Sequence, residues 1–299
     1  MVCPNCKRNI PDDSKLCCYC GQQHIEESSG MMLCSNPQCG KTIPSDSKFC
    51  PFCGTEVSST SAENSVQDKL TFEVNGVSFN MIRVEGGTFT MGATPEQEDP
   101  HYDAWPDHQV TLSSYYIGET QVTRALWKAV MGNNPSNFEG EDLPEVYLGW
   151  WFVQDFIDKL NEMTHRLFRL PTEAEWEFAA RGGNKSKAYQ YSGSNTIDEV
   201  AWYGENSDGK PHAVKTKMPN ELGIYDMNGN VWEWCNDWLN CHCNASQTAH
   251  QSPDGDTCRV VRGGSWADET CYCRSSYRCG MDCGGFADDR QGLRLALSE

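Results

Sequence analysis

A set of cysteines near the start of the chain has the residue type and the spacing of metal ligands. Cys3 and Cys6 are followed by Cys17 and Cys20, which is the two-knuckle spacing of a zinc ribbon. Residues 39–54 repeat residues 6–21 at an offset of 33, so the pattern occurs twice. We therefore predict two zinc ribbons, at residues 1–24 and 31–56, each holding one structural Zn²⁺. The predicted ligands are Cys3, Cys6, Cys17 and Cys20, then Cys34, Cys39, Cys50 and Cys53.

The predicted ribbons are short and polar. Such segments cannot bury a core of their own, so we expect zinc binding and folding to be one event. Cys18 aligns with Pro51 of the other copy and is predicted to be a spare thiol. Basic and acidic residues are balanced here, which favours protein contact or a purely structural role over nucleic-acid binding. Residues 57–69 are polar and rich in serine, which predicts a flexible linker.

A second candidate metal site lies in residues 220–238. Its apolar residues fit neither a strand period nor a helix period, so we expect an ordered loop. Asp226, Asn228, Asn230 and Glu233 supply oxygen donors, and Gly229 permits a tight reversal that lets main-chain carbonyls join them, as in small Ca²⁺ loops. A buried turn with side-chain-to-backbone hydrogen bonds and a tryptophan cluster behind it is the alternative.

The run GIYDMNGNVWEW (223–234) resembles the signature of the formylglycine-generating enzymes, also called sulfatase-modifying factors. Further similar segments follow the family's order: VEGGTFTMG (84–92), GETQVTRALWKAVMG (118–132), RLPTEAEWEFAARGG (169–183), and RGGSW (262–266) with GLRL (292–295). The resemblance implies an α+β, C-type-lectin-like domain with little regular secondary structure over residues 70–299. It also implies one calcium ion, held by Asp226, Glu233 and the main-chain carbonyls of Gly229 and Val231.

The oxidases of this family bind Cu(I) through two cysteines near the C-terminus and convert a substrate cysteine to formylglycine. Cu(I) is a soft ion that prefers two thiolates. Counted from the shared Gly-Gly-Ser, the second cysteine falls on Cys273, but the first falls on Asp268, a hard carboxylate. Ser265 and Trp232 match positions that line the oxidase pocket. We therefore predict a binding module, and a copper-dependent oxidase that uses Cys273 is the alternative.

The C-terminal tail offers a different indication. No Asn occurs after Asn244, and the residues between Trp266 and Gly292 are mostly of types that arise when the adenines of an Asn codon are replaced. This pattern resembles the variable proteins of diversity-generating retroelements, which display a diversified surface on a lectin-like fold. The predicted ligand-binding residues are Asp268, Tyr272, Tyr277 and Phe286. Alternatively, Cys279 with Cys283, or Cys241 with Cys243, forms a further metal clip.

Composition narrows the cellular setting and the partners. The 299 residues carry a net charge of −18, which disfavours a nucleic-acid partner. No apolar run is long enough to span a membrane, and the first residues do not resemble a secretory signal. With 17 cysteines in such a chain, we expect reduced thiols and a cytoplasmic protein. A protein or other ligand at the tail, and a protein at the ribbons, are the expected partners.

Three helices and several strands are predicted to position these residues. Residues 70–92 alternate with glycines between, which predicts short strands. Thr123 is predicted to cap a helix that Gly132 ends, and Thr172 with Glu175 forms a capping box that opens another. Between them, Val153, Phe156, Ile157 and Leu160 form the apolar stripe of a third helix. Family members commonly have Val-Ser-Trp-Asp-Asp before this helix, whereas this chain has LGWWF (148–152), an aromatic patch that is either buried or exposed for binding.

Overall fold

The computed structural model describes residues 31–33, 39, 41–44, 50, 52–55, 67–97, 107–239, 258–283 and 288–299. The chain divides into two units, Met1–Val66 and Gln67–Glu299. In the first unit, β1 (Met31–Leu33) pairs antiparallel with β2 (Thr42–Pro44). The predicted ligands Cys3, Cys6, Cys17, Cys20 and Cys34 lie outside the described residues.

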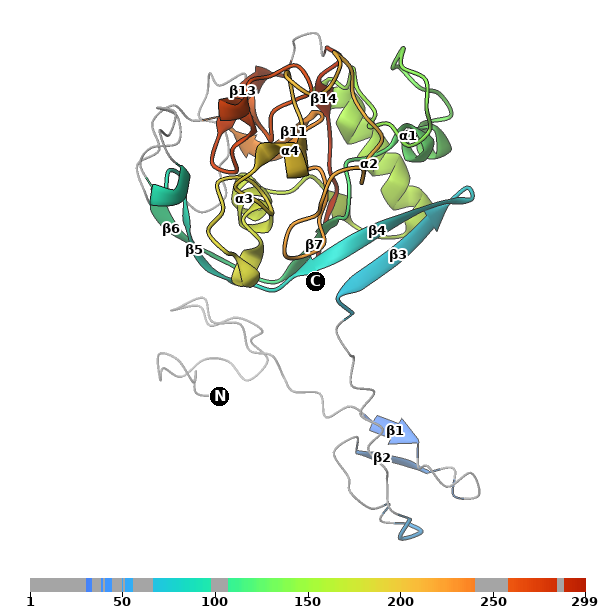
Figure 1. Ribbon diagram of the computed structural model, residues 1–299. Helices are drawn as coiled ribbons and strands as arrows, with labels where there is room; N and C mark the ends of the chain where they lie inside the picture. Colours follow the sequence, from blue (N-terminus) through green and yellow to red (C-terminus); the bar gives the residue numbers. More distant parts are fainter. Residues whose placement is uncertain are drawn as a thin grey trace, which may run out of the picture. The chain divides into compact units, whose positions relative to one another are not determined.

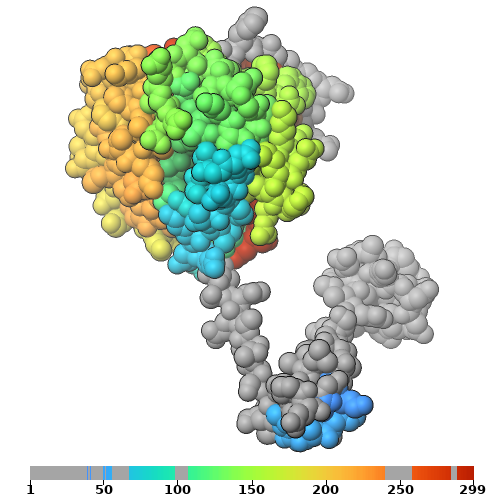
Figure 2. All heavy atoms as spheres, turned by 90° about the vertical axis from the view of Figure 1, so that its right-hand side faces the viewer, coloured from blue at the N-terminus to red at the C-terminus, as the bar shows by residue number. Residues whose placement is uncertain are grey.

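The large unit is built on a five-stranded antiparallel sheet in the order β3-β4-β7-β15-β8. Its strands are β3 (Lys69–Val74), β4 (Val77–Val84), β7 (Tyr115–Gly118), β8 (Phe168–Arg169) and β15 (Ala296–Ser298). β3 and β4 form a hairpin whose two turn residues, Asn75 and Gly76, both have positive φ, as a two-residue turn of this kind requires. The last strand, β15, lies between β7 and β8, so the C-terminus is built into this sheet (Figure 1). Figure 2 shows the cyan hairpin at the surface of the domain, beside the green residues around α1 (Arg124–Met131).

A second, four-stranded sheet in the order β13-β12-β11-β14 carries the candidate sites. Its strands are β11 (Trp232–Trp238), β12 (Cys258–Arg262), β13 (Arg278–Asp282) and β14 (Gln291–Gly292). The expectation of a loop throughout 220–238 was wrong for its second half, because β11 is a seven-residue strand. Its first four residues, Trp232 to Cys235, are all buried, so this part of the strand shows no alternating pattern, whereas Asn236 is exposed.

Short elements complete the domain. β5 (Gly87–Met91) pairs antiparallel with β6 (His108–Leu112), and β9 (Ala201–Trp202) pairs parallel with β10 (Asn228–Gly229). The 3-10 turns are η1 (Pro95–Gln97), η3 (Gly183–Lys185) and η4 (Thr270–Cys273), and α4 (Ile197–Val200) is a single helical turn. No helix of the described part is long and apolar enough to cross a membrane.

The three predicted helices are confirmed. In α1 the Thr123 hydroxyl accepts a hydrogen bond from Leu126 N at 3.3 Å, and Gly132 ends the helix at φ 82°. α2 (Trp150–Thr164) buries the predicted stripe, and its Phe156 ring stacks on Trp127 of α1 at 4.8 Å between centroids. In α3 (Glu173–Ala180) the predicted capping box is formed, with Thr172 N 2.8 Å from a Glu175 carboxylate oxygen.

A buried ion-pair network fastens α3 to the second sheet. The Arg262 guanidinium lies 2.9 Å from Glu173 and also pairs with Glu177, and Arg278 lies 2.6 Å from Glu173. Burying these charges away from water is unfavourable unless each one has a partner of opposite charge. Removing one partner would therefore leave an unpaired buried charge and destabilise the domain. Because Arg262 precedes the Gly-Gly-Ser segment, the network also fixes where the C-terminal tail begins.

Candidate functional site

Three of the predicted zinc ligands lie in the described part of the second ribbon. The Sγ atoms of Cys39, Cys50 and Cys53 all lie within 4.8 Å of one another, and those of Cys39 and Cys50 are 3.8 Å apart. Tetrahedral zinc with bonds of about 2.3 Å requires sulfurs roughly 3.8 Å apart. The arrangement therefore fits three of the four ligands of a zinc site, and the fourth predicted ligand, Cys34, lies outside the described residues.

The predicted calcium loop brings two buried carboxylates together. Glu233 accepts hydrogen bonds from both Arg294 Nε, at 2.9 Å, and Arg294 Nη2, at 2.8 Å, and from Trp176 Nε1 at 2.7 Å. Arg294 therefore already neutralises Glu233. Asp226 is only 3% exposed and accepts from Lys215 N at 2.9 Å, and no ion pair to it occurs among the described residues.

The electrostatic setting of Asp226 matches a cation site. Burial raises the pKa of its carboxyl to about 6, and the charge of Glu233 adds to this effect. Arg294 and Lys215 offset part of this rise in pKa. The side-chain amide of Gln121 donates hydrogen bonds to the main-chain carbonyl of Val231, at 2.9 Å, and to that of Asp226, at 3.2 Å, so both carbonyls already have a donor. Ca²⁺ prefers such oxygen ligands and would add positive charge beside the Asp226 carboxylate.

Asn228 and Asn230 do not contribute oxygens to such a site. The Asn228 side chain accepts from Ser192 N at 2.7 Å and donates to the carbonyl of Cys273. The Asn230 side chain accepts from His212 N at 3.0 Å. Both side chains therefore connect distant loops to the segment, as the alternative interpretation of a hydrogen-bonded turn expects. Calcium binding by Asp226 and Glu233 stays a prediction, and both Glu233 oxygens already accept hydrogen bonds from Arg294 or Trp176.

Asp268 is the residue that the family resemblance predicts to stand in place of the oxidases' first copper-binding cysteine. Its Oδ2 accepts a hydrogen bond from Trp232 Nε1 at 2.8 Å and another from the Ser265 hydroxyl. Its Oδ1 lies 3.8 Å from Arg290. Trp232 and Ser265, which were predicted to line the oxidase pocket, therefore lie together, and both donate hydrogen bonds to the Asp268 carboxylate.

Cys273 is close to this carboxylate but buried. Gly264, at φ 74°, packs against it so tightly that a Cβ there would lie 2.8 Å from the Cys273 sulfur. Burial raises the pKa of the Cys273 thiol well above its ordinary value, and the Asp268 charge raises it further. Among the residues around this carboxylate, Cys273 therefore supplies one buried sulfur, whereas Cu(I) prefers two thiolates.

An aromatic cluster connects this position to the tail. The Trp232 and Tyr277 rings are 6.0 Å apart, and Tyr272 meets Tyr277 edge-on at 5.0 Å. Tyr277 is 7% exposed and packs against Tyr272, and its role in ligand binding stays a prediction. Tyr272 is half-buried, on the 3-10 turn η4, and Phe286 lies outside the described residues.

Comparison with known proteins places both units. Residues 70–299 match the sulfatase-modifying factor enzyme 1-like domain, and residues 3–54 match the double zinc ribbon. The chain belongs to the sulfatase-modifying factor family. The chaperone protein LppX of Paenibacillus barcinonensis is 34% identical over 274 residues, covering 75% of this chain and 91% of that protein. The formylglycine-generating enzyme of Thermomonospora curvata is 32% identical over 169 residues, covering 51% of this chain and 54% of the enzyme.

Solved structures agree with this assignment. Treponema denticola variable protein 1 has a TM-score of 0.69 and 33% identity, covering 78% of this chain and 100% of that protein. PvdO from Pseudomonas aeruginosa has a TM-score of 0.68 and 23% identity, covering 78% of this chain and 99% of that protein. The large domain therefore has the predicted C-type-lectin-like α+β fold of the family.

The proposed clip between Cys279 and Cys283 is not supported. Cys279 lies within β13 and Cys283 follows its last residue, and a strand advances about 3.3 Å per residue. The two residues are therefore separated by more than ligands of one ion can be. Cys241 and Cys243 lie outside the described residues.

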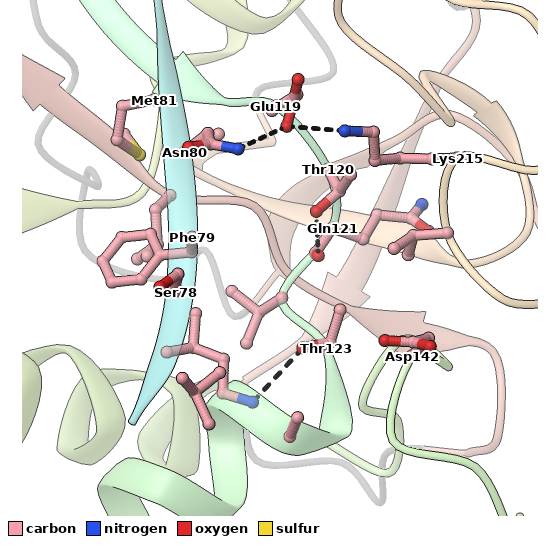
Figure 3. A pocket seen from close by; sticks show the side chains of 17 residues that line it. Ser78, Phe79, Asn80, Met81, Glu119, Thr120, Gln121, Thr123, Asp142 and Lys215 are labelled. Carbon is pink, nitrogen blue, oxygen red and sulfur yellow. Dashed lines mark hydrogen bonds and ion pairs between the residues drawn. The ribbon is translucent and has the colours of Figure 1, made fainter. Parts of the chain in front are cut away.

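The sequence did not predict a cavity beside β4. It has a volume of about 240 Å³ and is lined by β4 and by the segment between β7 and α1 (Figure 3). Its Glu119 lies 3.0 Å from both Lys69 and Lys215, and Asn80 donates to it at 2.8 Å. Burial alone would raise the pKa of Glu119, but these donors hold it below its ordinary value. Nothing local in the sequence marks these residues, because they come from four separate segments.

Proposed function

We propose that the large domain is a ligand-binding module whose contact surface is the C-terminal tail, residues 267–291. The observation that carries this proposal is Asp268, which stands where copper oxidation requires a thiolate. Its bonds to Trp232 and Ser265 use the residues that would otherwise line an oxidase pocket. Cys273 alone supplies one buried sulfur, so oxidation of a substrate cysteine is the less favoured function.

The exposed part of the tail supports binding. Glu269 and Asp282 are exposed and Tyr272 is half-exposed, while the scaffold beneath them is packed. A rigid aromatic side chain among carboxylates is a common anchor in protein interfaces. The 33% identity to a Treponema protein called a variable protein, together with the loss of Asn from this tail, supports a diversified surface.

In this proposal the metals are structural. Two zinc ions hold the ribbons, and Ca²⁺ at Asp226 and Glu233, with the carbonyls of Gly229 and Val231, holds the loop beneath the tail. The ribbons provide a second place for protein contact. A reducing, cytoplasmic setting suits the described cysteines, none of which forms a disulfide.

The experiment that tests this choice supplies the purified chain with Cu(I) and a peptide of the Cys-x-Pro-x-Arg type. We expect neither tight Cu(I) binding, measured by competition with a chelator, nor aldehyde on the peptide, measured by mass spectrometry. Asp268→Cys restores the missing thiol, and Asp268→Asn is its matched control. Aldehyde formed by the natural chain would overturn the proposal and make the protein an oxidase.

A further inference from the structure

The first turn of α2 exposes two large aromatic side chains next to a third that is buried. Trp150 is 5% exposed, whereas Trp151 is 68% and Phe152 is 61% exposed. The structure thus decides the question left open by the LGWWF segment, because one of the three rings belongs to the core and two face solvent. A pair of adjacent exposed aromatic residues is uncommon on a protein surface that has no partner.

Folding does not explain these two residues. Trp150 anchors the start of the helix, with its ring 5.7 Å from that of Trp234 and the Arg259 guanidinium 4.2 Å above it. Further along, the buried stripe of α2 supplies the remaining contacts with the core. Trp151 and Phe152 add nothing to this packing, so their residue types require a reason outside the fold.

The exposed pair lies at the same end of the domain as the tail. Tyr147, three residues before the helix, donates its main-chain N–H to the carbonyl of Asp288 at 3.0 Å. Gly292 packs so closely on the carbonyl of Glu145 that a Cβ there would lie 2.9 Å from it. The segment that leads into α2 therefore contacts the end of the tail. A ligand that covers the end of the tail therefore has Trp151 and Phe152 within reach.

The charge around the pair restricts what can bind. Asp155, Asp158 and Glu162 follow along the exposed face of α2, with Lys159 as the basic residue among them. The whole chain carries a charge of −18. Carboxylates repel anionic lipid surfaces and nucleic-acid phosphates, and they equally repel a second copy of the same acidic face. Basic side chains are attracted, and an Arg guanidinium also stacks on aromatic rings, as Arg259 does on Trp150 here.

We infer that Trp151 and Phe152 are an aromatic arm of the binding surface and that they dock a segment of a protein partner bearing Arg or Lys side chains. This inference rests on the proposed function, since it extends the tail surface onto α2. The aromatic rings supply buried apolar area and stacking, and the acidic residues behind them select for positive charge.

The test begins by selecting ligands for the full chain from a library of random displayed peptides. Selected peptides are synthesised and titrated against the chain and its variants. We expect them to be enriched in Arg or Lys, and we expect the double variant Trp151→Ala/Phe152→Ala to bind them on the order of 30-fold more weakly. Asp155→Lys should also weaken binding without removing an aromatic ring. Leu167→Ala is the matched control, because Leu167 is an apolar residue 82% exposed beyond the other end of α2.

The outcomes separate this inference from the proposal on which it rests. Peptides that bind the double variant as well as the natural chain, but lose binding with Tyr272→Ala, would overturn the inference and leave the tail surface in place. Peptides unaffected by either change would overturn both. Selected peptides without enrichment in Arg or Lys would overturn the inference. It would also be overturned if the natural chain bound anionic vesicles or formed dimers and the double variant did not.

Discussion

Removing the charge of Asp226 should stabilise the large domain when calcium is absent. It should also abolish the increase in melting temperature that calcium gives the natural domain. Asp226 is buried, and burial raises the pKa of its carboxyl from 3.8 to about 6. Arg294 compensates the neighbouring Glu233 but makes no side-chain ion pair with Asp226. Without calcium, the folded domain therefore carries a buried charge that Arg294 and Lys215 only partly offset, and Asp226→Asn would remove that charge.

The size of this effect follows from linkage. A pKa raised by about two units costs about 3 kcal/mol of unfolding free energy once the group is ionised in both states. Because the folded-state pKa lies above the unfolded-state pKa, the cost is absent below about pH 4 and fully present above about pH 6. For a domain of this size, about 3 kcal/mol corresponds to roughly 6–12 °C in melting temperature.

Thermal unfolding followed by circular dichroism at acidic and neutral pH, with chelator or with calcium, measures the effect. With chelator, we expect the natural domain to lose stability as the pH rises through this window and Asp226→Asn to lack this loss. With calcium, the natural domain should melt higher at neutral pH, by mass action on the folded state, and the variant should not respond. A natural domain whose melting is the same with chelator and with calcium would refute the calcium site and leave only the hydrogen-bonded turn.

Two other perturbations test the parts that support the surface. Elemental analysis should find about two Zn²⁺ per chain, and Cys53→Ser should release one of them, whereas Cys18→Ser should release none; zinc loss in the second variant would contradict the ligand assignment. Glu173→Gln leaves Arg262 and Arg278 without their shared partner and should lower the free energy of unfolding, measured in urea, by about 3–5 kcal/mol. The control Glu162→Gln, at an exposed position, should lower it by at most about 0.5 kcal/mol. Equal losses for the two variants would contradict the buried network.

Elements governed by local chemistry were predictable from the sequence. The caps at Thr123, Gly132 and Thr172 act on their own helix ends, so residue type and spacing suffice to place them. The apolar stripe of α2 has the helical period for the same reason. The zinc-ligand spacing also predicted which of the described sulfurs, those of Cys39, Cys50 and Cys53, lie together.

The parts that were missed depend on contacts between distant segments. β11 did not show a strand period because its first four residues are all buried, whichever face of the strand they occupy. The neutralisation of Glu233 by Arg294 joins residues far apart in the sequence, so the loop alone could not reveal it. Likewise, which of Trp150, Trp151 and Phe152 faces the core depends on where Trp234 lies.

The central claim, that the tail is a binding surface on a fixed scaffold, is tested most directly by sequencing this gene from closely related strains. We predict substitutions concentrated in residues 267–291, at exposed positions such as Glu269, Tyr272 and Asp282, and at codons matched by adenines in a nearby near-identical template. The buried Cys273 and Tyr277 should stay unchanged, because packed positions tolerate substitution poorly. Substitutions spread evenly over the domain, with no such template nearby, would contradict the claim.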